Sequence, residues 1–416
     1  MFSIIDCNNF YVSCERVFRP DLEHQPVLVT GNNDGCIIAR SNEVKALGIA
    51  MGAPLHTIRP LIQRHQIAVF SANYALYGDM SQRVMRVIEE QTSGALEIYS
   101  IDEAFVKLNT SPAQLEPQAA HLRSIVRQQT GIPVSIGIAA TKTLAKLANT
   151  CAKKLPTGVI SLSDDHSIDE LLRVMPVDEV WGIGAKRAEW LIGQGIRTAY
   201  QLKCADPVWI QRHLTAPAAR IVWELRGVSC LPLDADPAPK KEICTSRAFG
   251  KAIQSEQELA EAVAFYTSRA AEKLHKQGGL ASLITVFLHT NPFQPDLPQY
   301  AAHCKVPLAE PTGNAAELIA AAKRGLRQCY KQGYFYHKAG VILSQITSET
   351  MAQGTLFPLA RDSRDERLQA VVDIINRTYG RNTMYLAACG TQRTWQMKQG
   401  RRSPRYTTSW DELLKV

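Results

Sequence analysis

Two acidic positions far apart in the sequence limit the fold of this chain more than any other feature. Asp6 follows an apolar run at the N-terminus, and Asp102 and Glu103 lie between the apolar runs 96–99 and 104–106. Because successive residues of a regular strand point to opposite faces, the paired acids can both face one site only at a turn or bulge. The pattern therefore predicts a β-hairpin with these acids at its tip.

A third carboxylate that reaches this tip from another strand end would complete a site for two divalent ions. Two ions held about 3.5–4 Å apart can stabilise the attacking and leaving oxygens of an in-line phosphoryl displacement. Mg²⁺ suits this role because it keeps several waters and is held by a few carboxylates and substrate phosphates. The alternative is that the three acids act as caps or form salt bridges at the surface, and their spacing alone leaves both interpretations open.

Further motifs follow in a recognisable order. They are the stretch that Asp6 opens, the segment around the acid pair, and an apolar strand followed by a lysine-bearing helix, at residues 6–15, 100–105, 134–139 and 141–154. Together they resemble the catalytic palm of Y-family, translesion DNA polymerases. The resemblance covers the whole chain and is closest to the UmuC subgroup, which contains the catalytic subunit of bacterial DNA polymerase V. Segments that resemble this subgroup in particular lie at 32–40, 73–77 and 403–408.

Strand-like and helix-like runs alternate, which predicts an α/β multi-domain protein. Helices are expected over residues 42–47, 79–90, 113–130, 141–154, 260–276 and 315–332, and strands over 27–29, 36–39, 134–139, 158–162, 282–289 and 339–346. The resemblance implies a right-handed polymerase with a helix-hairpin-helix in its thumb. The implied parts are the palm (1–18 and 76–165), small fingers (19–75), helical thumb (166–232), linker (233–241), α/β little finger (242–348) and a C-terminal partner-binding region (349–416).

The resemblance assigns the acids to metal binding. Asp6 and Asp102 would bridge two Mg²⁺ ions, and Glu103 would hold the catalytic ion. The backbone carbonyl of Cys7 would complete the shell of the nucleotide-binding ion. One ion would activate the primer 3′-hydroxyl while pyrophosphate leaves on the other. No separate acidic cluster resembles a proofreading exonuclease, which is consistent with error-prone synthesis.

Apolar residues are implied to surround the incoming nucleotide. The resemblance places both Phe10 and Tyr11 among the nucleotide-binding residues. Tyr11 matches the family's steric gate, whose ring packs against C2′ of the sugar and excludes a 2′-hydroxyl. Without the resemblance, Tyr11 is more simply interpreted as a core aromatic. Ile38 and Ala39 are expected to roof the nascent base pair.

Cations for the triphosphate are expected on two helices. Lys45 matches a position where archaeal members of the family carry arginine, so it keeps the charge without the bidentate fork. Lys153 matches the family's second phosphate-binding lysine, and Asn42 falls where many relatives have a phosphate-binding tyrosine. The alternative for both lysines is a solvated helix face.

A basic balance fits a polyanionic partner, since the formal net charge is +8. Gly182 and Gly184 resemble a helix-hairpin-helix turn, in which the missing Cβ lets backbone N–H groups approach a phosphate. Binding to DNA should weaken steeply with salt. The cations expected to line the DNA are Lys142, Lys146, Lys186, Arg187 and Arg247.

Two features of the C-terminal region indicate protein partners. Gln353, Leu356 and Phe357 resemble the clamp-binding peptide of bacterial polymerases, in which a Leu-Phe pair fills an apolar pocket. Between Asp373 and Asp411 the chain carries lysines and arginines but no acid. In the family, this tail binds the UmuD′ dimer and RecA. A generic, solvated basic tail is equally compatible with the sequence.

The resemblance implies an error-prone translesion DNA polymerase of the SOS response that acts on primer-template DNA and deoxynucleotides. Nucleotidyl cyclases also use a palm-like sheet and two metals, but the gate tyrosine, the glycine turn and the basic little finger argue against them. A non-catalytic DNA-binding scaffold, or a Y-family polymerase without accessory subunits, is the alternative. The sequence shows neither a secretory segment nor a membrane span, which predicts a cytoplasmic protein that joins the nucleoid when bound to DNA.

Overall fold

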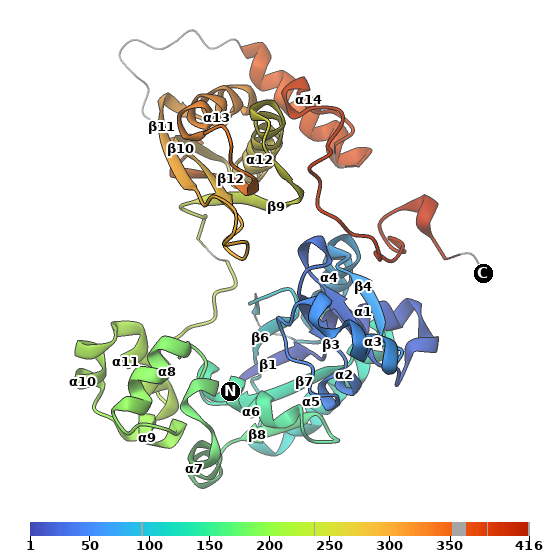
Figure 1. Ribbon diagram of the computed structural model, residues 1–416. Coiled ribbons are helices and arrows are strands. Elements are labelled where there is room, and N and C mark those ends of the chain that lie inside the picture. The colour runs from blue at the N-terminus through green and yellow to red at the C-terminus, as the bar shows by residue number, and fades with distance from the viewer. Residues whose placement is uncertain (93–94, 237, 352–362, 381, 415–416) are drawn as a thin grey trace. The chain divides into compact units, whose positions relative to one another are not determined.

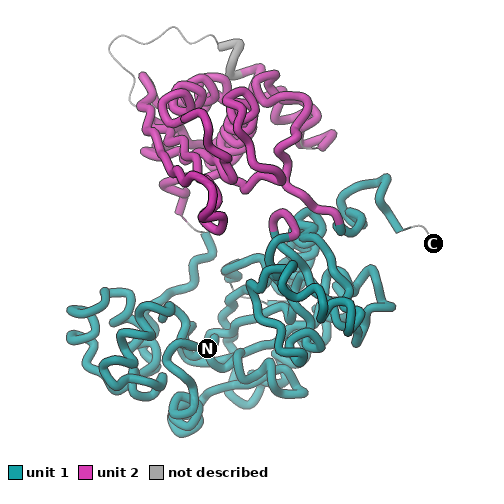
Figure 2. Tube along the Cα trace, viewed as in Figure 1, with its two compact units in different colours: residues 1–31, 35–237, 401–416 teal, residues 32–34, 238–400 magenta. Residues whose placement is uncertain are grey.

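The computed structural model describes residues 1–92, 95–236, 238–351, 363–380 and 382–414 (Figure 1). The chain forms two compact units (Figure 2). The first unit contains residues 1–31, 35–237 and 401–416, and the second contains residues 32–34 and 238–400. The main boundary falls inside the predicted linker. The C-terminal residues, predicted as one region, are divided between the two units.

A five-stranded sheet organises the first unit (Figure 1). Its strands, in spatial order, are β5 (Leu96–Ile98), β6 (Glu103–Lys107), β1 (Phe2–Cys7), β7 (Val134–Ala139) and β8 (Val159–Leu162). Central β1 pairs antiparallel with both β6 and β7, while β8 runs parallel to β7. β5 and β6 pair antiparallel, which confirms the hairpin predicted around the acid pair.

Helices cover both faces of this sheet because its strands alternate two apolar sets. Ile5 and Val106 pack into a core shared with α1, α4 and α5, whereas Ile4 and Phe105 pack into a core shared with α6. The helices are α1 (Phe10–Phe18), α4 (Tyr74–Gln91), α5 (Pro112–Thr130) and α6 (Lys142–Ala152). Asp6 continues the face of Ile4 and is therefore directed toward α6.

A three-stranded sheet lies in the segment predicted as fingers. Its order is β3 (Ile37–Arg40), β2 (Val27–Thr30) and β4 (Ala68–Ser71), and the same segment contains α2 (Asn42–Ala46) and α3 (Arg59–Arg64). β2, β3 and α2 match the elements expected from the sequence. β4 and α3 are not expected from it, because four to six residues carry little periodic signal.

Short helices make up most of residues 165–225. They are α7 (Asp165–Val174), α8 (Ala185–Gly193), α9 (Ala199–Cys204), α10 (Pro207–His213) and α11 (Ala216–Leu225). Their apolar residues share a core with α6 and with one face of the five-stranded sheet. The helical content predicted over 166–232 is therefore present, and the assignment of this segment as a thumb stays a prediction.

A four-stranded antiparallel sheet organises the second unit, and α12 and α13 cover it (Figure 1). The elements are β11 (Ala301–Thr312), β10 (Gly279–Thr290), β12 (Tyr336–Ser348), β9 (Ile243–Ile253), α12 (Glu256–Lys276) and α13 (Ala315–Cys329). The helices and strands predicted over 260–346 are all present. β11 escapes prediction because it is a largely exposed edge strand that contains Pro307 and Pro311.

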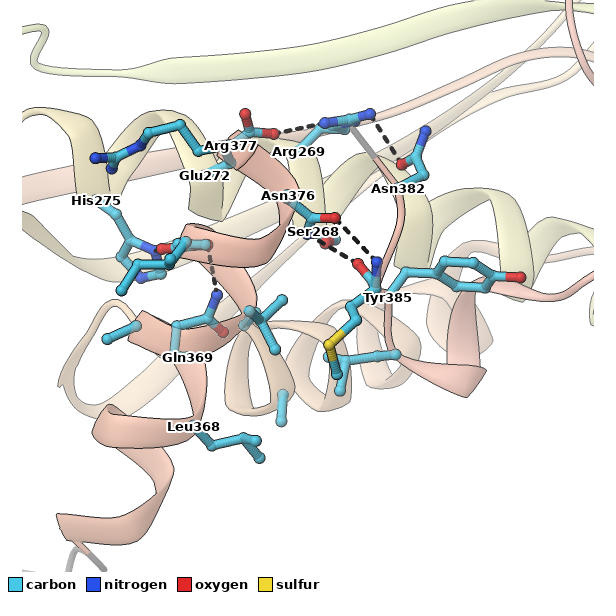
Figure 3. A pocket seen from close by; sticks show the side chains of 18 of the residues that line it. Ser268, Arg269, Glu272, His275, Leu368, Gln369, Asn376, Arg377, Asn382 and Tyr385 are labelled. Atoms are coloured by element: carbon cyan, nitrogen blue, oxygen red, sulfur yellow. Dashed lines mark hydrogen bonds and ion pairs between the residues drawn. The ribbon is translucent and has the colours of Figure 1, made fainter. Parts of the chain in front are cut away.

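One helix lies where the sequence shows no clear periodicity. In α14 (Ser363–Thr378), an Asp373 carboxylate oxygen lies 3.3 Å from His275 Nδ1 of α12. Figure 3 shows the pocket that α14 lines, where Arg269 donates to Glu272 at 2.6 Å and to Asn382 at 2.9 Å. No helix within the described ranges is long and apolar enough to cross a membrane.

Candidate active site

Strand register brings the three predicted acids to one end of the five-stranded sheet. Asp6 lies directly opposite Glu103 in the antiparallel β1–β6 pair. Cys7 donates its backbone N–H to the Asp102 carbonyl at 2.8 Å, which attaches the hairpin turn to the end of β1. Ser100 Oγ donates to Asp102 Oδ1 at 2.5 Å and orients this carboxylate within the turn. The four residues predicted as metal ligands are therefore neighbours.

Two lysines from α6 and its C-cap pair with these acids. Lys153 Nζ, at the C-cap of α6, donates to Asp6 Oδ2 at 2.7 Å. Lys146 Nζ donates to both Glu103 carboxylate oxygens, at 3.1 and 3.0 Å. Because Asp6 and Glu103 share the sheet face that α6 covers, the helix neutralises part of their charge.

Asp6 lies in an environment that disfavours its charge. Its side chain is only 9% exposed, and burial raises the pKa of Asp6 to about 7 against the lowering effect of Lys153. The neighbouring Glu103 carboxyl raises the pKa of Asp6 further. A divalent ion bound by Asp6 and Glu103 would relieve this repulsion, because it stabilises the ionised forms of both groups.

The donor set at this end of the sheet fits Mg²⁺. In the part of the chain that the structure describes, no three His, Cys, Asp or Glu side chains already form a ligand cluster. The available donors are the hard oxygens that Mg²⁺ prefers, namely the carboxylates of Asp6, Asp102 and Glu103 and the carbonyl of Cys7. Lys146 and Lys153 supply positive charge to the same oxygens, so a bound ion would compete with these ammonium groups.

We expect the Asp6→Asn variant to be more stable than the parent in metal-free buffer at pH 8. Asparagine keeps the size of the side chain but removes a buried charge, so the free energy of unfolding should rise by ~2 kcal/mol. Because the pKa of Asp6 is higher in the folded than in the unfolded chain, this difference should be complete above pH 7 and vanish below pH 3.8. Urea unfolding in EDTA measures it, with Asp79→Asn on α4 as a control. A destabilised Asp6→Asn variant would show that the ion pair with Lys153 outweighs burial.

The predicted gate tyrosine is held between aromatic rings at the start of α1. Tyr11 stacks on Tyr77 with ring centroids 4.4 Å apart and an interplanar angle of 15°, and Tyr74 meets it edge-on at 6.2 Å. Tyr11 is half-buried, and burial, followed by the nearby Tyr74 and Asp102, raises the pKa of Tyr11 to about 12. The ring is therefore neutral, fixed in place and close to the acidic turn.

Phe10 has a different position from the one predicted for a nucleotide-binding residue. Its side chain is 3% exposed and belongs to the core that also contains Val12 and Leu76. One residue corresponds to about 100° around a helix, so α1 turns Phe10 inward while Tyr11 keeps an exposed edge. The assignment of Phe10 to nucleotide contact is corrected to core packing beneath Tyr11, whose ring centroid lies 5.7 Å away.

Cations gather beside the acids. Lys45 Nζ, in α2, donates to Asn9 Oδ1 at 2.6 Å and to Asn42 Oδ1 at 3.3 Å. Burial lowers the pKa of Lys45, and the positive charges of Arg40 and Lys153 lower it further. A polyanion would relieve this repulsion, so the arrangement suits the binding of a triphosphate.

β3 presents the two residues predicted to roof the base pair. Ile38 is partly exposed and Ala39 is 7% exposed, and both pack against the same core as Tyr11. Their contact with a base pair stays a prediction.

The glycine turn precedes α8 as the helix-hairpin-helix resemblance implies. Gly182 has a left-handed φ of 89°, and a Cβ there would lie 2.8 Å from Ile221 Cδ1. Gly184 is the N-cap of α8 and has ordinary φ, and a Cβ at this position would meet no atom within 4 Å. Lys186 is exposed, and Arg187 donates to the Gly182 carbonyl at 3.0 Å, so these cations lie at the turn.

We expect Gly184→Ala to fold normally and to bind primer-template DNA ~3–10-fold more weakly, because a phosphate that approaches the backbone would meet the new methyl group. Fluorescence anisotropy and thermal unfolding separate these effects. The control is Gly193→Ala in the same helix, which also introduces a Cβ into open space. Equal affinity of both variants and the parent would remove Gly184 from the DNA contact.

Among the cations predicted to line DNA, Lys142 is misassigned. Its side chain is 4% exposed, forms an ion pair with Glu97 and donates to the Pro232 carbonyl at 2.7 Å, so it is a structural residue. Lys146 forms an ion pair with Glu103 at the acidic site. Arg247, in β9 of the second unit, is exposed and stays a candidate for DNA contact.

The predicted clamp-binding residues Gln353, Leu356 and Phe357 lie outside the described residues. Their assignment stays a prediction. The same holds for partner binding by the C-terminal region.

Sequence reasoning missed several residues around the gate. Asn9 adopts a left-handed φ of 47° and contacts both Asn42 and Lys45. Its signal was available, because asparagine tolerates this conformation better than most residues. Tyr77 and Glu15 gave no such signal, since both depend on contacts between distant segments.

Family models match most of this chain. The model described as the impB/mucB/samB family matches residues 5–150, and the model of that family's C-terminal domain matches residues 240–356. A domain of unknown function (DUF4113) matches residues 366–416.

Individual relatives match along its whole length. The chain is 43% identical to Protein ImpB of Salmonella typhimurium over 99% of each chain, and 41% identical to Protein UmuC of Salmonella typhimurium strain LT2 over 100% of each. It is 27% identical to DNA polymerase IV of Desulfatibacillum aliphaticivorans over 93% of this chain and 96% of that one. The solved structure of a Y-family DNA polymerase chimera, Dbh-Dpo4(243-245)-Dbh, matches with a TM-score of 0.66 at 18% identity, covering 84% of this chain and 100% of the other. This likeness confirms the predicted multi-domain α/β fold.

Proposed function

The chain belongs to the impB/mucB/samB family and is a Y-family DNA polymerase, and we propose that it performs error-prone, template-directed translesion synthesis in the SOS response. It would add deoxynucleotides to a primer 3′-hydroxyl without proofreading. The observation that carries this proposal is the β1–β6 register, which gathers Asp6 and Glu103 opposite each other and Asp102 at the adjoining turn.

The site residues divide the chemistry among them. When bound, two Mg²⁺ ions supply activation of the attacking hydroxyl and neutralisation of the leaving pyrophosphate. Asp6, Asp102, Glu103 and the Cys7 carbonyl would hold these ions. Lys153, now on Asp6, would be free to bind a phosphate oxygen once the carboxylate has a metal partner.

Nucleotide selection would depend on the groups beside the acids. Lys45, with Arg40 close enough to lower its pKa, would bind the triphosphate, and Asn42 would orient Lys45. Tyr11 would occupy the space that a ribose 2′-hydroxyl needs. Ile38 and Ala39 would cover the nascent base pair without filling the room that a distorted template base requires.

Contacts with DNA and with partners complete the proposal. Gly182, Gly184 and Lys186 would hold the phosphate backbone of the duplex through contacts that carry no sequence information. Gln353, Leu356 and Phe357 would bind a sliding clamp, and the C-terminal region would bind the UmuD′ dimer and RecA. These partners would bring the polymerase to damaged DNA in the nucleoid.

Primer extension across an abasic template site, with Mg²⁺ and deoxynucleotides, tests the proposal. The parent chain is assayed alone, with UmuD′, with activated RecA and with both. We expect extension past the abasic site in at least the last condition, and activity without either partner would place the chain with Y-family polymerases that need no accessory subunits. Tight DNA binding without extension in every condition would favour a non-catalytic scaffold.

A further inference from the structure

The C-terminal segment 401–406 belongs to the first unit and is hydrogen-bonded to the start of α4 (Figure 2). Ser71 donates its backbone N–H to the Arg401 carbonyl at 3.0 Å and accepts the Arg401 N–H on Oγ at 2.9 Å. Asn73 Nδ2 donates to the carbonyl and Oγ of Ser403, both at 3.0 Å, and its Oδ1 accepts from the N–H of Leu76 at 3.4 Å. The residue that caps α4 therefore also holds the tail.

A stacked aromatic pair adds a second attachment. Tyr406 lies against Phe18 of α1 with ring centroids 4.6 Å apart and an interplanar angle of 12°. Ser403 itself is 5% exposed, so this part of the tail is enclosed by the first unit. The tail thus contacts both α1 and α4, the two helices that carry the gate aromatics.

A buried acid connects the tail to these aromatics. Glu15 of α1 is fully buried, and its Oε1 accepts hydrogen bonds from the Tyr77 hydroxyl at 2.7 Å and from Ser403 Oγ at 3.0 Å. Within the described residues, Glu15 Oε2 has no hydrogen-bond partner. Burying a carboxyl group with one unsatisfied oxygen costs free energy, so the two hydrogen bonds that Glu15 accepts are important for holding it in place. Removing one of the two donors should therefore change the hydrogen bond made by the other.

Tyr77 transmits this connection to the nucleotide site. It is fully buried, its hydroxyl is fixed by Glu15, and its ring carries the stacked Tyr11. We propose that Ser403 is a positioning residue for sugar selection, which acts through Glu15 and Tyr77 to hold Tyr11 against the sugar of the incoming nucleotide. This inference rests on the proposed function, and it gives the docked tail a role inside the polymerase.

The test compares the ratio of kcat/KM for a deoxynucleotide to that for the matching ribonucleotide. Ser403→Ala should lower this ratio ~5-fold, mainly by raising ribonucleotide use. The reason is that the Glu15 carboxylate, which also holds the Tyr77 hydroxyl, loses the second of its two hydrogen-bond donors. Ser403→Thr keeps a hydroxyl and should restore the ratio. Ser409→Ala, in the same tail but without a side-chain cap contact, should leave it unchanged. All four proteins, parent included, are first compared by thermal unfolding.

A second pair of variants tests the route. Tyr77→Phe keeps the ring but removes the hydroxyl, so it should lower the ratio by a similar factor. If both residues act through Glu15, the double variant Ser403→Ala/Tyr77→Phe should show much less than the product of the two effects. An unchanged ratio in an active Ser403→Ala variant, or equal losses with both nucleotides, would overturn this inference alone. Absence of extension by the parent would instead overturn the proposed function and this inference with it.

Discussion

Replacing Asp102 with asparagine will reduce primer extension by ~10³-fold or more, because the proposed two-metal site would lose one of its bridging carboxylates. The substitution is mild for the fold. Asp102 lies in the hairpin turn, is partly exposed, and accepts from Ser100 Oγ through an oxygen that asparagine also provides. Single-turnover extension with saturating deoxynucleotides measures the loss.

The control for this variant is an acid outside the site. Asp79 lies on α4 and pairs with Arg83 at the surface, so Asp79→Asn should extend primers at nearly the parent rate. Affinity for primer-template DNA should stay within ~2-fold of the parent for both variants, because neither residue is a phosphate-binding cation. Full extension by Asp102→Asn would exclude this carboxylate from metal binding and leave the acidic turn as a structural feature.

Removing the ring of Tyr11 will produce the second large effect. The Tyr11→Ala variant should incorporate ribonucleotides ~10²-fold more efficiently relative to deoxynucleotides, a change of ~3 kcal/mol in the activation free energy. The physical reason is steric, since the stacked Tyr77 and the edge-on Tyr74 hold the Tyr11 ring in one place. Steady-state kcat/KM for paired nucleotides on an undamaged template gives the ratio.

The phenylalanine variant separates ring from hydroxyl. Tyr11→Phe keeps the stacked ring and should retain the discrimination of the parent, whereas a hydroxyl-dependent mechanism would make it resemble Tyr11→Ala. If Tyr11→Ala selects deoxynucleotides as well as the parent, the gate lies elsewhere and the stack is part of the core. Thermal unfolding of both variants is needed, because loss of aromatic packing costs about 0.5–1.5 kcal/mol beyond area burial.

Much of the site could be predicted because the relevant patterns are local. The apolar runs on either side of Asp102 and Glu103 predicted a hairpin, and β5 and β6 form it. Tyr11 and Phe10 are adjacent in sequence, yet only the helical phase of α1 decides that Phe10 enters the core. The chemical type of a residue can thus be predicted from the sequence more often than the orientation of its side chain.

The missed elements share a cause. α3 and β4 are too short for periodicity, and β11 is an exposed edge strand with two prolines. The residues of α14 themselves show no strong amphipathic pattern. In each case the local signal is weak, and contacts with other elements stabilise the conformation.

The lysines of α6 and its C-cap also show that sequence alone does not predict which partner a side chain meets. Lys142, Lys146 and Lys153 look alike in sequence as cations on one helix. In the structure, Lys142 is buried against Glu97, Lys146 pairs with Glu103 and Lys153 pairs with Asp6. Their roles differ because the β1–β6 and β5–β6 registers together place Asp6, Glu103 and Glu97, and so decide which acid each lysine meets.

The sequence by itself determined the α/β class, the hairpin at the acid pair, and the residue types that the proposed metal site uses. Tertiary structure decided that Asp6 faces Glu103, that Tyr11 stacks on Tyr77, and that Ser403 reaches the buried Glu15. The physical reason is that strand and helix periodicity is encoded in neighbouring residues, whereas register, burial and pKa depend on segments that meet only when the chain has folded.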